Sequence, residues 1–123
     1  MNELRFTIEG KPQPKQRARR GKGGRWYTPR ETREYEMRVR GAAVLAATHE
    51  AERWPVDYEG AVAVEVHVYW PDARRRDVDN VVKSVLDGMQ ARPTRSAAWR
   101  REGGVILDDA QVRDLRVTTA IDR

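Results

Sequence analysis

Residues 77–87 carry side chains that could hold a metal ion beside a phosphate group. Three arginines, residues 74–76, come directly before them. Three carboxylates, a carboxamide and a lysine stand in this segment of eleven residues: Asp77, Asp79, Asp87, Asn80 and Lys83. Hard divalent cations prefer carboxylate oxygens, and such a cation activates water and neutralises phosphate charge. Acidic residues gathered in a basic chain therefore point to metal-assisted phosphate chemistry.

The spacing in this segment predicts a helix from Asn80 to Met89 with two separate faces. At about 100° per residue, one arc of about 140° holds only apolar residues. These are Val81, Val82, Val85, Leu86 and Met89. The opposite arc holds the polar residues, with Asp79, Lys83 and Asp87 one turn apart along it.

Asp77 precedes the predicted helix in extended chain, where residues i and i+2 point to the same side. We therefore expect Asp77 and Asp79 to converge at the mouth of the helix, which itself favours anions such as phosphate. Asp108 and Asp109 follow a short apolar run far along the chain. They could add a further carboxylate from another part of the fold.

Each of these features also has a simpler interpretation. Asp79 could only cap the helix, as aspartate often does. Lys83 could be a solvated side chain paired with Asp79 or Asp87. Asp108 and Asp109 could form an ordinary turn. The residues alone leave these alternatives open.

The positive charge of the chain is concentrated in one segment. The 123 residues include 24 basic and 19 acidic side chains, for a net charge of +5. Residues 11–30 hold eight basic residues and no acidic one, and the remainder holds 16 basic and 19 acidic residues. A polyanion is the expected partner, with nucleic acid first and an anionic membrane second. The alternative is a solvated loop without a ligand.

The elements around these motifs predict a single small α/β domain over residues 1–123. Apolar alternation predicts strands over 3–9, 60–70 and 112–121, and a short strand over 105–107. A helix should run from Thr28-Pro29-Arg30-Glu31 to about Glu52. Residues 11–27 read as a basic loop without regular structure and 90–104 as a basic insertion. The order β-α-β-α-β-β indicates two main helices on a mixed four-stranded sheet.

Composition excludes several classes of protein. There are no cysteines, so disulfides, thiolate zinc sites and cysteine nucleophiles are excluded. The sequence starts without an apolar signal region, and no apolar run approaches the roughly 20 residues that span a bilayer. We expect a cytoplasmic protein with no membrane partner and no small-molecule organic cofactor.

The segment Arg75-Arg76-Asp77-Val78-Asp79-Asn80-Val81-Val82-Lys83-Ser84-Val85-Leu86-Asp87 resembles the core signature of the RusA family of Holliday junction resolvases. Leu107-Asp108-Asp109-Ala110-Gln111-Val112 resembles the second motif of that family. Gly10-Lys11-Pro12, Lys15-Gln16-Arg17-Ala18-Arg19 and Tyr27-Thr28-Pro29 resemble its amino-terminal motifs. The resemblance covers nearly the whole chain in the family's order. It departs at Val78 and Val81, where leucine is common, and in the longer stretch from Gln90 to Gly104.

The resemblance implies a RusA-like fold and a homodimeric, Mg²⁺-dependent endonuclease, with Mn²⁺ as a substitute, that cuts four-way DNA junctions symmetrically. It places the catalytic acids and metal ligands at Asp77, Asp79 and Asp109, with Asp108 as a further candidate ligand. It places the catalytic lysine at Lys83, with Asn80 and Asp87 in support. The expected phosphate contacts are Lys15, Arg17, Arg19, Arg20, Lys22, Arg25, Arg75 and Arg76. A bacterial or phage source is expected.

Two other functions fit the same features. The chain could be an architectural DNA-binding dimer that has the fold without activity, although it holds all the acids and Lys83. It could also be a metal-dependent nuclease with broader specificity for branched DNA.

Overall fold

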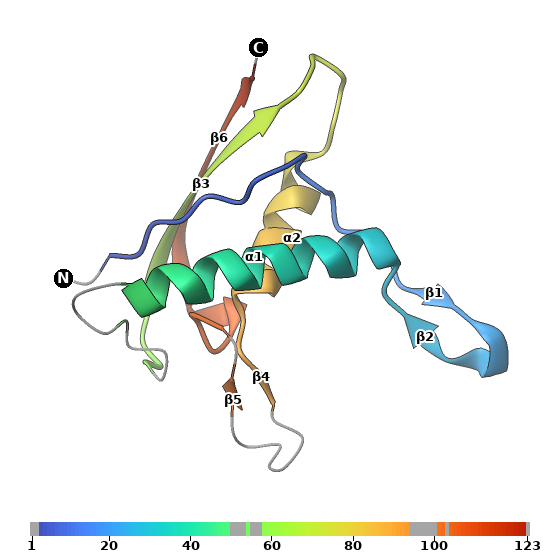
Figure 1. Cartoon of the computed structure of the whole chain (residues 1–123), viewed down its shortest axis with the longest axis horizontal. Coiled ribbons are helices and arrows are strands. Elements are labelled where there is room, and N and C mark those ends of the chain that lie inside the picture. The colour runs from blue at the N-terminus through green and yellow to red at the C-terminus, as the bar shows by residue number, and fades with distance from the viewer. Residues whose placement is uncertain (1–2, 50–53, 55–57, 94–100, 103, 123) are drawn as a thin grey trace.

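The computed structural model describes residues 3–49, 54, 58–93, 101–102 and 104–122 (Figure 1). Two main helices and several short and long strands form a small α/β domain, as the sequence predicts. The strands form three two-stranded sheets in the described residues, instead of the single four-stranded sheet that we expected. None of the described helices has the length and apolar character needed to cross a bilayer.

A β-α-β unit forms the centre of the domain. Strand β3 (Val62–Trp70) lies parallel to β6 (Val112–Ile121), in a register that runs from Val62 opposite Val112 to Trp70 opposite Ile121. Parallel neighbours require a crossover, and helix α2 (Val78–Met89) lies within that connection. The alternating valines of β3 turn one face inward, because successive side chains of a strand point to opposite faces. The predicted strands at 60–70 and 112–121 and the second predicted helix are thus confirmed.

Helix α1 (Arg30–His49) crosses α2 and closes the core from the other side (Figure 1). Its apolar stripe includes Tyr35, Val39 and Ala43, all buried. The two helices approach closely at Gly88, where a Cβ atom would lie 2.6 Å from Cβ of Val39. The predicted end of this helix near residue 52 lies outside the described residues.

The predicted strand over residues 3–9 is not formed. Leu4, Phe6 and Ile8 are half-buried and pack against the core, as their alternation indicates. In the described part of the chain, however, no backbone hydrogen bond joins this segment to a strand. Alternation reports which side chains are buried, and a strand also needs a neighbouring backbone.

The predicted short strand over residues 105–107 is reduced to one bridge between Ile106 and Gln90. Val105 and Ile106 are buried, and their backbone N–H groups both donate to the carbonyl of Met89. The chain turns at Asp108 immediately afterwards, so no ladder can form.

The basic segment contains a hairpin, so the prediction of a loop without regular structure is wrong for residues 19–27. Strand β1 (Arg19–Arg20) pairs antiparallel with β2 (Trp26–Tyr27) across a 3₁₀ turn, η1 (Lys22–Gly24). Gly23 and Gly24 have φ values of 79° and 76°, a region that glycine adopts without strain. The glycines that seemed to break the structure therefore make the turn.

A second antiparallel pair lies in the predicted insertion over residues 90–104. Strands β4 (Arg92–Pro93) and β5 (Arg101–Glu102) are its two sides. The segment between them, residues 94–100, lies outside the described residues.

Candidate active site and basic hairpin

The structure removes the simplest explanation of the two acids at the start of α2. The helix begins at Val78, so Asp77 is its N-cap residue and Asp79 lies inside the first turn. The side chain of Asp77 makes no capping hydrogen bond. A cap residue normally uses its side-chain oxygen to accept from a free backbone N–H. Neither aspartate is therefore explained as a helix cap.

Lys83 also departs from its simplest interpretation. It lies one turn after Asp79 and one turn before Asp87, the spacing at which helical ion pairs form. Among the described residues, Asp77, Asp79 and Lys83 nevertheless make no side-chain hydrogen bond and no ion pair. All three side chains are exposed. Two carboxylates and an ammonium group are thus held close together in sequence and left open to a ligand.

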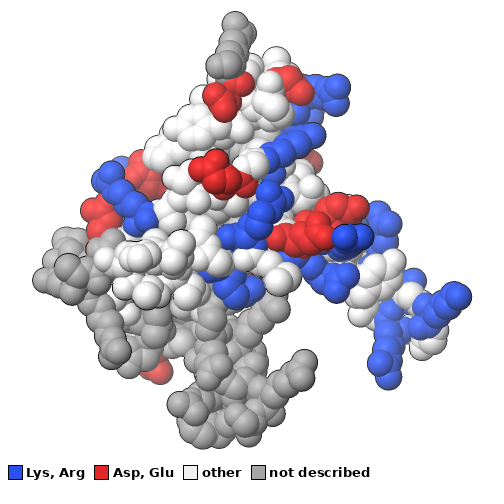
Figure 2. All heavy atoms as spheres, in the orientation of Figure 1, with Lys and Arg blue, Asp and Glu red and all other residues white. Residues whose placement is uncertain are grey.

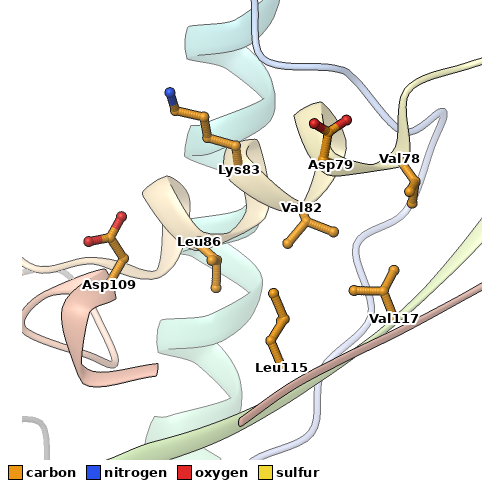
Figure 3. Close-up of a pocket in the computed structure, with 8 residues that line it drawn as sticks. All are labelled: Val78, Asp79, Val82, Lys83, Leu86, Asp109, Leu115 and Val117. Atoms are coloured by element: carbon orange, nitrogen blue, oxygen red, sulfur yellow. The ribbon is translucent and has the colours of Figure 1, made fainter. Parts of the chain in front are cut away.

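A cleft of about 380 Å³ lies between α2 and β6 and is bordered by three of the four predicted catalytic residues. Asp79, Lys83 and Asp109 point away from its apolar walls, with Lys83 between the two acids (Figure 3). The apolar walls come from α2 and β6: Val78, Val82, Leu86, Leu115 and Val117. Asp77 precedes α2 and does not line the cleft. Within the described residues, no three carboxylate or imidazole groups are close enough to form a ready metal cluster.

Asp108 and Asp109 occupy a turn whose geometry is fixed by a buried glutamine. The N-cap residue of the 3₁₀ helix η2 (Asp109–Gln111) is Asp108, whose carboxylate accepts from the backbone N–H of Ala110 at 2.8 Å. Oε1 of Gln111 accepts from the backbone N–H groups of Leu107 and Asp108, at 2.8 and 3.0 Å.

Nε2 of Gln111 binds a different part of the chain. It donates to the carbonyls of Tyr58 and Gly60, at 2.7 and 3.0 Å, just before β3. Gln111 thus ties the turn with Asp109 to the entrance of β3, a role that our sequence reasoning missed. The signal was present, because Asp108 and Gln111 have the spacing of a capping box.

The end of the cleft at Asp109 is electronegative. A side-chain hydrogen bond with Asp108 raises the pKa of Asp109, and desolvation and the charges of Asp108 and Asp87 act in the same direction. Like charges disfavour one another's ionised form, and a bound cation reverses this effect. This carboxylate therefore lies where a cation would be stabilised.

We expected Lys15 to contact phosphate and Asp87 to support the catalytic residues, and in the structure these two side chains are bound to each other. Nζ of Lys15 lies 3.0 Å from Oδ2 of Asp87 and also pairs with Glu36, whose side chain is buried. The backbone N–H of Lys15 donates to the carbonyl of Asn80 at 2.9 Å. Burial alone would lower the pKa of Lys15, but hydrogen bonds to the two carboxylates outweigh it and raise that pKa. Lys15 anchors the amino-terminal segment on α2 and is not open to phosphate.

The polar face of α2 is also less exposed than the helical pattern suggests. Asn80 is half-buried and Ser84 is completely buried. The hydroxyl of Ser84 has no hydrogen-bond partner among the described residues. The open polar stripe is therefore limited to the first two turns, at Asp79 and Lys83.

The two arginines before Asp77 differ from each other. Arg75 is exposed. Arg76 pairs with Asp72 at 2.6 Å, donates to the carbonyls of Asp72 and Arg74, and lies over the ring of Trp70 at 5.0 Å. Arg76 thus stabilises the loop that leads into Asp77. Its guanidinium group is paired with Asp72, although we expected it to contact phosphate.

The remaining predicted phosphate contacts lie in or beside the hairpin of β1 and β2, and all are exposed: Arg17, Arg19, Arg20, Lys22 and Arg25. Figure 1 shows this hairpin projecting from the body of the domain, and Figure 2 shows basic side chains along the same projection. No acidic residue occurs between positions 11 and 30 to neutralise them. The hairpin is thus a protruding, purely cationic surface.

Comparison with known proteins finds relatives that cover most of the chain. A family model described as endodeoxyribonuclease RusA matches residues 9–123. The crossover junction endodeoxyribonuclease RusA of Aquifex aeolicus is 27% identical over 124 residues, covering 100% of this chain and 85% of that protein. The protein of that name from Escherichia coli K12 is 39% identical over 56 residues, or 46% of this chain and 38% of that protein. The residues that the family model matches include α2 and the turn at Asp109.

Proposed function

Because the chain belongs to the RusA family of endodeoxyribonucleases, we propose that it resolves four-way DNA junctions by paired, symmetric cleavage that depends on a divalent metal ion. One observation carries the proposal: Asp77, Asp79 and Lys83 are exposed and unpaired in the part of the chain that the structure describes. Exposed carboxylates without hydrogen-bond partners leave their oxygens available to a hard divalent cation. The related proteins named crossover junction endodeoxyribonuclease support the choice of substrate.

The carboxylates would hold the metal ion. The donor set at the start of α2 is made of hard oxygen ligands without competing hydrogen bonds, which suits Mg²⁺, with Mn²⁺ as a substitute. Asp77 and Asp79 would supply two ligands. The described residues hold no preformed cluster of three carboxylates, so Asp109, with Asp108 beside it, would have to move towards the ion to supply a third. When bound, the ion would lower the pKa of a water molecule and neutralise charge on the phosphate.

Lys83 would act on the phosphate itself. Its ammonium group borders the same cleft as Asp79 and Asp109. From there it would donate to a phosphate oxygen or to the leaving oxygen and stabilise the charge that develops during cleavage. The exposed basic residues of the hairpin would hold the phosphates of the DNA arms, and binding would weaken steeply with salt.

Symmetric cleavage requires two active sites. We propose that two copies of the chain form a two-fold dimer, the commonest arrangement of homo-oligomers. Sedimentation of the protein alone and on junction DNA tests this state. A monomer in both conditions contradicts it.

The decisive experiment is the variant Asp79→Asn. Because Asp79 is exposed and caps nothing, the variant should fold normally and bind junction DNA. Loss of a ligand that stabilises the transition state should slow cleavage by roughly 10²- to 10³-fold or more. Asp122→Asn removes the same charge from an exposed position at the end of β6 and serves as the matched control.

The outcomes separate the alternatives. Cleavage by Asp79→Asn at the wild-type rate refutes the proposed site. Binding without cleavage by the wild-type protein, in Mg²⁺ or Mn²⁺, identifies an architectural protein. Equal cutting of four-way, flap and linear DNA identifies a nuclease with broader specificity.

Thermal unfolding tests metal binding independently of cleavage, since ligands that bind only the folded state raise its stability. Mn²⁺ should raise Tm in the wild type and not in Asp79→Asn.

A further inference from the structure

The hairpin carries two exposed aromatic rings among its arginines. Trp26 is 69% exposed and Tyr27 is 48% exposed. Tryptophan is highly buried on average in folded proteins. An indole ring left in solvent at the end of a cationic projection is therefore a candidate contact for a partner.

Strand register places each ring beside an arginine. Arg20 is opposite Trp26 and Arg19 is opposite Tyr27 across the β1–β2 pair. Residues directly opposite each other in an antiparallel pair lie on the same face, with Cβ atoms about 4.5–5.5 Å apart. Each face of the hairpin thus carries one aromatic residue directly opposite one arginine.

The two rings are not equivalent. A Cβ atom at Gly21 would lie 3.3 Å from two ring carbons of Tyr27, so that ring packs on the backbone of its own hairpin. Trp26 lies on the other face and makes no side-chain hydrogen bond with the described residues. Its ring remains available for stacking.

The surroundings of Trp26 select the partner. Cationic side chains around an open aromatic ring are the combination with which proteins bind unpaired nucleic-acid bases, since every base has a π-face. The absence of acidic residues from positions 11–30 fits a phosphate backbone running past the ring. In continuous duplex the bases already stack on each other, whereas bases at a branch point can expose a face.

We propose that Trp26 stacks on a base exposed at the branch point of the DNA, while Arg20 beside it holds the adjacent phosphate. This inference rests on the proposed function and extends it, because it assigns recognition of branched over linear DNA to the hairpin. Trp26 is a binding residue in this scheme and takes no part in the chemistry at Asp79 and Lys83.

The test compares Trp26→Ala, Trp26→Phe and Arg20→Ala in binding to a four-way junction and to a linear duplex of the same length, without Mg²⁺, over a range of salt concentrations. A 2-aminopurine base at the branch point reports stacking directly. Because Trp26 is exposed, each Trp26 variant should have the Tm of the wild type.

Trp26→Ala should weaken junction binding by about 10- to 100-fold, as expected for loss of one stacked base, and leave duplex binding unchanged. Its plot of log affinity against log salt should keep the wild-type slope, because no phosphate contact is lost. Trp26→Phe should keep most of the affinity. Arg20→Ala should weaken binding to both DNAs and reduce the slope by about 0.9.

Three results would overturn the inference: equal loss of junction and duplex binding in Trp26→Ala, unchanged junction binding, or a shift of Trp26→Ala from dimer to monomer in sedimentation. The last result would assign the ring to a second copy of the chain. A wild-type protein that binds junctions through Trp26 without cutting them would contradict the proposed function and leave this inference standing.

Discussion

Gln111 offers the sharpest test of how the fold positions Asp109. Its side chain is 9% exposed and makes four hydrogen bonds with backbone groups. Two are accepted from the turn at residues 107–108, and two are donated to residues 58 and 60. The substitutions Gln111→Leu and Gln111→Glu separate these two halves, because leucine loses all four bonds and glutamate keeps the two that the oxygen accepts.

The magnitudes follow from counting the bonds. An intramolecular hydrogen bond contributes about 1 kcal/mol net, and a buried group left without a partner costs about 1–3 kcal/mol. Gln111→Leu should therefore lower the free energy of unfolding by about 3–4 kcal/mol, a large part of the 5–15 kcal/mol typical of a domain. Gln111→Glu should lower it by about 2 kcal/mol near neutral pH.

The glutamate variant should also acquire a dependence on pH. Only the protonated carboxyl can donate to the carbonyls of Tyr58 or Gly60, so folding favours the protonated form and raises the pKa of the introduced group above its unfolded value, about 4.3. A group with a raised pKa contributes stability below the unfolded pKa and loses it as pH rises through the folded pKa. The difference in free energy of unfolding between the wild type and Gln111→Glu should therefore become smaller as pH falls towards about 4.

Urea unfolding of the wild type and both variants at pH 7 and pH 4.5 measures these differences. If both variants stay within about 0.5 kcal/mol of the wild type, the glutamine clamp has no energetic role. If the glutamate variant is as unstable as the leucine variant at both pH values, the separation into donor and acceptor halves is wrong. Cleavage assays should use conditions in which every variant is fully folded.

Three further predictions concern α1 and its contact with α2. Lys15→Met should lower the free energy of unfolding by about 1–3 kcal/mol, since it breaks two partly buried ion pairs. In the wild type the pKa of Lys15 is raised, so the stability from these ion pairs is present below the ordinary value of 10.5 and is lost as pH rises above it. The free energies of unfolding of variant and wild type, measured in urea, should therefore converge in strong alkali. Gly88→Ala should destabilise by about 1–2 kcal/mol, because overpacking against Val39 outweighs the gain in helix propensity. Gly41→Ala, which meets nothing within 4 Å, should stabilise α1 by up to about 1 kcal/mol in the same assay.

The parts of the fold that the sequence predicted are those set by local periodicity. The valines of β3 alternate over nine residues, and the apolar side of α2 is continuous, so both elements were predicted from their own residues. The prediction failed where a partner decides the structure. Leu4, Phe6 and Ile8 alternate like a strand, yet no described strand pairs with them.

The prediction of a loop failed at the hairpin for a different reason, because its glycines are compatible with either an irregular loop or a tight turn. Glycine weakens regular structure on average, and it also permits the positive φ values of a tight turn. Only the backbone hydrogen bonds between Gly21 and Arg25, at 2.8 Å, and between Gly24 and Gly21 decide for the turn. A stretch rich in Gly and Arg between two strands of only two residues each is too short to show the alternation that signals a hairpin.

The roles of the charged residues depended most on tertiary contacts. Lys15 and Arg76 belong to basic segments and were expected to meet phosphates, but each has an acidic partner in the fold. The partner of Lys15 is 72 positions away in sequence, at Asp87. A charge that a distant residue neutralises cannot be told from a free one in the sequence. The exposed arginines of the hairpin are not neutralised in this way, because no acidic residue lies among them.

The crossing of α1 over α2 explains why three equally spaced residues of one helical stripe have different roles. Asp79, Lys83 and Asp87 are four residues apart, and a helical wheel treats them alike. The helices approach each other closely at Gly88, so α1 brings buried Glu36 beside the last turn of α2, where Lys15 binds both carboxylates. Asp87 is thereby withdrawn from the open surface. The carboxylate at that end of the cleft must come from elsewhere, and the turn that Gln111 holds supplies it as Asp109.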